Sequence, residues 1–136
     1  MKKFIILFIL SVFLYADGIN WINDINKAQK IAKVQNKIIM VFIEASHCPW
    51  CEKMKEETLS QKDVVRNINK YYVALKVDAD SNEVQKTFGN ISITPTLMFY
   101  SPDGEPLEIM EGYQNEEFLF WGMSRAEEKF KSLQKK

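Results

Sequence analysis

The feature that most constrains the fold of this chain is a pair of cysteines, Cys48 and Cys51, set between an apolar run and a segment of helix formers. Residues 38–43 (Ile-Ile-Met-Val-Phe-Ile) are continuous, apolar and largely β-branched, which predicts a buried central strand. Pro49 suits the first position of a helix, where its missing N–H would be unpaired anyway, and helix formers follow over residues 50–59. A cysteine pair at such a strand-to-helix junction indicates redox chemistry much more strongly than an isolated pair of the same spacing.

The position of the pair predicts different roles for its two sulfurs. Cys48 comes where the free N–H groups and the dipole of the helix point at its sulfur, and both favour the thiolate, which is the reactive form. Cys51 comes one turn later, so we expect it to be better buried and to resolve a mixed disulfide by attacking Cys48. We therefore expect a nucleophile at Cys48 and a resolving thiol at Cys51, with no cofactor and no metal.

Other uses of a cysteine pair compete with this hypothesis. A purely structural disulfide would close a very short loop, for which the stabilisation is smallest. A zinc site needs about four protein ligands, and the chain has two cysteines and one histidine, His47. Haem attachment requires a histidine directly after the second cysteine, where Glu52 stands. A binding module that captures a soft metal such as Cu(I) with Cys48, Cys51 and His47 remains an alternative to an enzyme.

The bulk composition excludes one class of partner and bounds the size. The 136 residues suffice for one domain with a useful core. The chain carries 18 basic and 18 acidic residues and has a sequence pI of about 6.6. A nucleic-acid-binding surface would need a basic stripe and a high pI. We therefore expect no nucleic-acid partner, and because no dimerisation segment is evident we expect a monomer.

The first residues differ from the rest of the chain. Residues 1–3 include two lysines, and residues 4–14 are apolar except for Ser11. This is the layout of a secretory signal peptide. The apolar run ends by Ala16 and is shorter than the roughly 20 residues that a membrane-spanning helix needs, which favours a cleaved signal over a retained anchor. We expect a signal peptide at residues 1–16, a mature domain at residues 17–136 and a periplasmic location, where disulfides persist.

The rest of the chain shows alternating helices and strands that end in a hairpin. Apolar residues from Ile22 to Ala32 recur at helical spacing and predict a helix up to about residue 35, for which Asn23 or Asp24 is the candidate cap. Further helices are predicted at residues 50–59, 63–69, 81–88 and 115–133, and strands at residues 38–43, 72–78, 96–100 and 106–110. Alternation first and a hairpin last predict an α/β fold with a mixed central sheet flanked by helices. We expect Trp21 and Trp121 to pack in the core or between helices.

Three stretches of the chain resemble the thioredoxin superfamily. They are the strand 38–43 with the residues that lead to Cys51, the strand that ends at Lys76-Val77-Asp78, and Ile93-Thr94-Pro95-Thr96. The chain is similar to periplasmic thioredoxin-like proteins, including the C-terminal domain of the thiol:disulfide interchange transporter. The resemblance implies a thioredoxin fold and a reductase of client-protein disulfides that receives electrons from a membrane partner. An oxidase or isomerase of the same fold is the alternative, and the Pro-Trp dipeptide and His47 point toward a more oxidising potential because they favour the thiolate.

The resemblance also implies roles for residues outside the cysteine pair. The proline that matches Pro95 is cis in the family and faces the cysteines. The residue before it, here Thr94, offers its backbone to an extended substrate strand. Trp50 is expected to be exposed and to form an apolar docking surface with Pro95. The alternative is that Pro95 merely starts an edge strand.

The chain departs from the family pattern at three positions. Thioredoxins carry a buried acid six residues before the first cysteine, where this chain has Phe42, and the lysine that faces that acid is replaced by Ala74. Glu44 either substitutes for the acid or caps the strand end. His47 replaces the usual tryptophan: its protonated form would favour the Cys48 thiolate, or it is an exposed loop histidine without a role.

Overall fold

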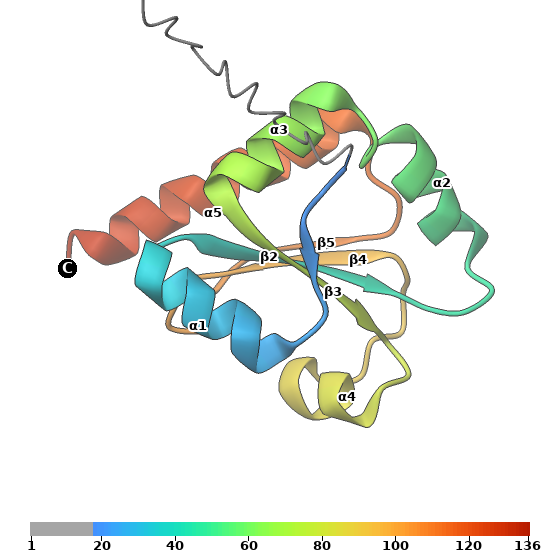
Figure 1. Ribbon diagram of the computed structural model, residues 1–136, viewed down its shortest axis with the longest axis horizontal. Coiled ribbons are helices and arrows are strands. Elements are labelled where there is room, and N and C mark those ends of the chain that lie inside the picture. Colours follow the sequence, from blue (N-terminus) through green and yellow to red (C-terminus); the bar gives the residue numbers. More distant parts are fainter. Residues whose placement is uncertain (1–17) are drawn as a thin grey trace, which may run out of the picture.

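The apolar run at residues 38–43 forms β2 (Ile38–Glu44), the middle strand of a five-stranded sheet. The structure is a computed structural model that describes residues 18–136 (Figure 1), so the expected signal peptide lies outside the described residues. The sheet has the order β1-β3-β2-β4-β5, formed with β2 by β1 (Trp21–Ile22), β3 (Tyr72–Asp78), β4 (Thr96–Tyr100) and β5 (Pro106–Glu111). β1 and β2 run parallel to β3, whereas β4 is antiparallel to both β2 and β5.

Helices cover both faces of the sheet, as its apolar residues require. One face is covered by α1 (Ile25–Gln35) and α4 (Asn82–Phe88), and the other by α2 (Pro49–Glu57), α3 (Lys62–Tyr71) and α5 (Glu116–Gln134). Successive side chains of a strand point to opposite faces. Met40 and Phe42 therefore pack on the side of α5, and Val41 and Ile43 on the side of α1. The predicted mixed sheet with helices on both faces is confirmed.

β1 was not predicted from the sequence, and the start of α1 explains why. Asp24 is the N-cap of α1, and its carboxylate accepts a hydrogen bond from the Lys27 N–H at 2.8 Å. The helix therefore begins at Ile25 and excludes Ile22, which pairs with Leu75 of β3 instead. The predicted cap at Asp24 is confirmed, whereas the prediction that Ile22 belongs to the helical face is wrong, because the cap fixes the first helical residue more tightly than apolar spacing does.

The last helix corrects a second expectation. Trp121 is 54% exposed and its ring lies under the guanidinium of Arg125 at 4.7 Å, so it is neither a core nor a helix-packing residue. The buried side of α5 carries small and flexible residues, among them Gly122. A Cβ at Gly122 would lie 2.1 Å from the Met110 sulfur, so the glycine lets α5 approach β5 closely.

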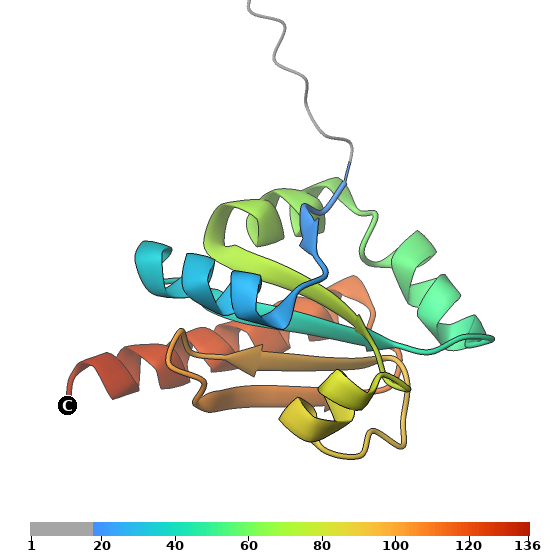
Figure 2. The same ribbon diagram turned by 60° about the horizontal axis from the view of Figure 1, so that its bottom comes forward.

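The topology brings three loops to the end of the sheet at which β2 finishes. β2 runs toward α2, and both views show α2 beyond that end (Figures 1 and 2). The loops that precede β4 and follow β5 come to the same end, since the Gly112 N–H donates to the Pro95 carbonyl at 2.8 Å. No helix within residues 18–136 is long and apolar enough to cross a membrane.

Candidate active site

Cys48 occupies the N-cap of α2, directly after the loop that leaves β2. Its backbone is extended (φ −106°, ψ 96°), and Pro49 takes the first helical position. The Cys51 N–H donates to the Cys48 sulfur at 3.2 Å, and the Glu52 N–H donates to the Cys48 carbonyl at 3.2 Å. The Cys48 sulfur therefore lies at the positive end of the helix, where a thiolate is stabilised.

The two cysteines form a disulfide but differ in accessibility. Their Cα atoms are 5.2 Å apart and their sulfurs are bonded. Cys48 is half-buried, whereas Cys51 is 1% exposed and belongs to the core beneath α2. Cys48 is therefore the member of the pair that a second protein can reach.

The loop before β4 places a hydroxyl on the same sulfur. Thr94 Oγ1 donates to Cys48 Sγ at 3.4 Å, and the Thr94–Pro95 peptide bond is cis. Pro95 is buried, and β4 lies between β2 and β5, so this proline does not start an edge strand. The exposed apolar surface beside the disulfide thus comes from Trp50 rather than from the proline ring.

Trp50 lies inside the disulfide loop and is 55% exposed. Its ring centroid is 5.8 Å from that of Tyr113, which lies in the loop between β5 and α5. The Lys53 ammonium is 4.9 Å from the centroid of Trp50 and 5.4 Å from that of Tyr113. The Tyr113 hydroxyl donates to the Glu57 carboxylate at 2.8 Å, which ties this loop to α2.

The expected acid beneath the cysteines is replaced by apolar packing. Phe42 is fully buried and its ring lies 5.8 Å from that of Trp21. Glu44 instead forms an ion pair with Lys55 at 2.9 Å, and Lys55 also binds Glu52 at 2.7 Å. The hydrogen bonds to Glu52 and Glu44 raise the pKa of Lys55 above its usual value, so this lysine keeps its charge to a higher pH than a free lysine does.

His47 lies in the loop just before the nucleophile. It is exposed, and its φ of 55° places it in the left-handed region that few residues other than glycine adopt readily. Within residues 18–136 no hydrogen bond or ion pair joins its ring to another side chain. Its place at the mouth of the site fits both of the roles that the sequence left open.

Comparison with known protein families decides what kind of domain this is. A family model described as a thioredoxin-like domain matches residues 25–123, which include both cysteines and the Thr94–Pro95 loop. The chain belongs to the thioredoxin-like family. The predicted thioredoxin fold is thereby confirmed, and the linked cysteine pair gives this thioredoxin-like chain the chemistry of a thiol–disulfide oxidoreductase.

Individual relatives agree with this assignment. The chain is 25% identical over 103 residues to the thiol:disulfide interchange protein DsbD of Campylobacter jejuni, a match that covers 74% of this chain and 18% of that protein. It superposes on a thioredoxin from Thermus thermophilus with a TM-score of 0.69 and 26% identity, covering 79% and 86% of the two chains. The C-terminal domain of DsbD from Neisseria meningitidis in its oxidised form has the same fold, with a TM-score of 0.60, 21% identity and coverage of 74% and 90%. The chain thus spans a small part of the curated DsbD protein.

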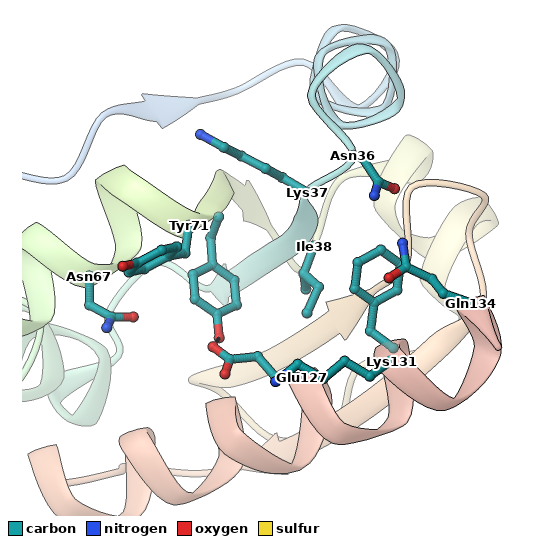
Figure 3. A pocket seen from close by; sticks show the side chains of 10 residues that line it. Asn36, Lys37, Ile38, Asn67, Tyr71, Glu127, Lys131 and Gln134 are labelled. Atoms are coloured by element: carbon teal, nitrogen blue, oxygen red, sulfur yellow. Dashed lines mark hydrogen bonds between the residues drawn. The ribbon is translucent and has the colours of Figure 1, made fainter.

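The opposite end of the sheet holds an open cavity of about 460 Å³ that contains neither cysteine. Figure 3 shows Asn36, Ile38 and Lys131 around it, contributed by the end of α1, the start of β2 and α5. Within it the Tyr72 hydroxyl donates to Glu127 at 2.6 Å. β2 separates this cavity from Cys48 by about 20 Å, at roughly 3.3 Å per residue. The cavity of this thioredoxin-like domain is therefore remote from its redox pair.

No metal site accompanies the cysteines in the part of the chain that the structure describes. Residues 18–136 contain no group of three or more histidine, cysteine, aspartate or glutamate side chains placed to hold a metal ion. The donor set around the disulfide consists of the two sulfurs, the Thr94 hydroxyl and backbone N–H groups. Such a set supports thiol–disulfide exchange.

Four contributors to the site were not found from the sequence. Lys55 is the partner of Glu44, the Thr94 side chain reaches Cys48, and Tyr113 lies against Trp50. Lys53 follows Trp50 by three positions, a spacing that places both on one side of a helix and could have indicated their contact. Tyr113 has no local signal, because only the fold brings the end of β5 to α2.

Proposed function

We propose that this chain is an exported reductase of protein disulfides that uses the Cys48–Cys51 pair and works as a monomer. The observation that carries the proposal is the position of the Cys48 sulfur. It lies at the N-terminus of α2, half-buried, and accepts hydrogen bonds from the Cys51 N–H at 3.2 Å and the Thr94 hydroxyl at 3.4 Å. These groups stabilise a thiolate that a client protein can reach.

The reaction follows from the two sulfurs alone. In the reduced protein the Cys48 thiolate attacks one sulfur of a client disulfide, and the other client sulfur leaves as a thiolate that takes up a proton. The Cys51 thiol then loses its proton and attacks the Cys48 sulfur, which releases the second client thiol. The client gains two electrons and two protons, and the Cys48–Cys51 disulfide forms. The burial of Cys51 directs its attack to Cys48 rather than to solvent species.

The cycle requires an external dithiol that reduces the Cys48–Cys51 disulfide again. The similarity to the interchange protein DsbD supports a membrane-bound dithiol partner as that donor. The layout of residues 1–16 supports export, with Asp17 as the first residue of the mature protein. N-terminal sequencing of the protein recovered from the cell envelope tests this boundary. A protein that retained Met1 would contradict a cleaved signal.

The first experiment is the reduction potential of the pair, measured by equilibration with glutathione. We expect a value near about −270 mV, which is the range of thioredoxin. A value near about −120 mV would identify a strong oxidant and would overturn the reductive direction. The same preparation is tested for insulin reduction and for Cu(I) retention. Tight retention of Cu(I) with fewer than one turnover per chain would favour a metal-binding module instead.

A further inference from the structure

An exposed cation lies beside the disulfide and rests on two aromatic rings. Trp50, Lys53 and Tyr113 form this surface, which we call the aromatic–lysine platform. The Lys53 ammonium is 4.9 Å from one ring centroid and 5.4 Å from the other. Contact with both ring faces attracts the ammonium and restricts its motion. The platform adjoins the reactive sulfur because Trp50 lies between the two cysteines in the chain.

The charge of Lys53 is left available for a second molecule. Two carboxylates of α2 already have partners, since Glu52 binds Lys55 and Glu57 accepts from the Tyr113 hydroxyl. No carboxylate among residues 18–136 forms an ion pair with Lys53. The ring faces attract the ammonium but do not accept all three of its N–H bonds. A carboxylate can therefore bind the exposed side of the ammonium while the rings hold it in place.

We propose that the aromatic–lysine platform recognises an acidic side chain next to the disulfide of the client. This inference rests on the proposed function and names the chemical class of its substrate. A client segment that brings one of its sulfurs to Cys48 passes over Trp50. A glutamate or aspartate in that segment then meets the Lys53 ammonium, whereas a lysine there meets a like charge. The cost of ordering the lysine side chain is already reduced by its ring contacts, which strengthens an exposed ion pair.

The test uses two synthetic peptides with one intramolecular disulfide each, identical except for a glutamate or a glutamine beside one cysteine. The pre-reduced full chain is mixed with each peptide, and the second-order rate constant is measured by acid quenching and chromatography. We expect the glutamate peptide to react about threefold faster at low ionic strength, the size of one partly ordered surface ion pair. The ratio should fall toward one at about 1 M salt, where charges are screened within about 3 Å.

Variants separate the platform from the overall charge of the protein. Lys53→Gln should bring the ratio between the two peptides to about one, and Lys53→Glu should reverse it, so that the glutamine peptide reacts faster than the glutamate peptide. Lys86→Gln, on the exposed last turn of α4, removes the same charge away from the site and should keep the threefold preference. A lost preference in Lys86→Gln, or an unchanged preference in Lys53→Gln, would overturn the inference.

The outcomes also distinguish the inference from the function on which it rests. If wild type reduces both peptides at equal rates, the platform does not select acidic clients, but the reductase proposal stands. If wild type reduces neither peptide, both proposals fail. Circular dichroism of the Lys53 variants shows whether each remains folded, as expected for an exposed position on a helix.

Discussion

The two ends of β2 present opposite chemistry although one strand connects them. At its carboxyl end α2 begins, so free N–H groups and a positive dipole end meet the Cys48 sulfur. At its other end α1, α3 and α5 all terminate around the cavity of about 460 Å³, and this end meets the negative ends of three helices. Lys37 and Lys131 line that cavity, where the negative ends of the helices favour positively charged side chains.

The comparison shows that reactivity depends on an accessible nucleophile and on the electrostatic field of the helix ends, not on the volume of a cavity. The disulfide end offers an accessible sulfur with two hydrogen-bond donors. The cavity end offers a hollow of about 460 Å³, but the Tyr72 hydroxyl within it already donates to Glu127. We therefore assign catalysis to the first end and stability to the second.

The largest effect is expected from the cysteines. Cys48→Ser should abolish insulin reduction, because the remaining thiol, that of Cys51, is 1% exposed and cannot reach the client. Cys51→Ser should also abolish turnover, but it should accumulate a covalent mixed disulfide with the client through Cys48. Mass spectrometry under non-reducing conditions detects this adduct. If the adduct formed in Cys48→Ser instead, the assignment of the nucleophile would be wrong.

The next effect concerns stability at the cavity end. Burial and the Glu127 carboxylate raise the pKa of Tyr72 above its usual value of 10.0. Because the pKa is raised on folding, the stability that the Tyr72 hydroxyl contributes is fully present below pH 10 and is lost as the pH rises toward the pKa of the folded state. Tyr72→Phe should lower the free energy of unfolding by about 1.5 kcal/mol at pH 7, the value of a hydrogen bond to a charged group.

Urea denaturation at several pH values measures this difference, and insulin reduction serves as the control. The gap in stability between wild type and Tyr72→Phe should narrow above pH 10, because only wild type carries the hydroxyl that ionises. Insulin reduction at pH 7 should not change. A loss of turnover in Tyr72→Phe would contradict the assignment of catalysis to the disulfide end of β2 and of stability to the cavity end.

A smaller effect is expected from the hydroxyl beside the nucleophile. Thr94→Val keeps the shape of the side chain but removes the donor at 3.4 Å from the Cys48 sulfur. The thiolate loses one hydrogen bond of about 1 kcal/mol, so its formation should require a higher pH. The rate of iodoacetamide alkylation against pH reports this, with an upward shift of the midpoint. Thr87→Val, at an exposed position of α4, is the matched control. An unchanged midpoint in Thr94→Val would show that the contact does not stabilise the thiolate.

The smallest effect is expected at Glu44. The Lys55 ammonium at 2.9 Å already occupies its carboxylate, so Glu44→Gln should change insulin reduction by less than about twofold and the free energy of unfolding by less than about 1 kcal/mol. Steady-state rates and urea denaturation check both values. A tenfold loss of turnover would instead show that Glu44 takes over the role of the buried acid that Phe42 replaces.

Local patterns were sufficient for most of the architecture and for the cysteine pair. The apolar run of β2, the proline at the start of α2 and the cap at Asn115 all act within a few residues, so they can be recognised in the sequence. β1 has only two residues, which is too short for a period to appear. Trp121 is equally apolar whichever side of α5 it lies on, and only the close packing at Gly122 decides which side is buried.

The surroundings of the cysteines could be predicted only in part. The hydroxyl contact of Thr94 joins residues 46 positions apart, and the contact between Trp50 and Tyr113 spans an even longer separation. Such pairs depend on how two loops meet at one end of the sheet. The family resemblance pointed to Thr94 and Pro95, but the Lys53 ammonium between two rings required the folded chain.

The close approach of α5 to β5 has a consequence for chemical durability. The thioether of Met110 is 7% exposed and fills the space opposite Gly122, where even a single added carbon would lie 2.1 Å from its sulfur. Conversion of this thioether to a sulfoxide adds a polar oxygen to a buried apolar contact. We therefore expect the close packing to slow the reaction of Met110 with peroxide, and we expect a sulfoxide at Met110 to weaken the packing of α5 on β5 until the oxygen is removed.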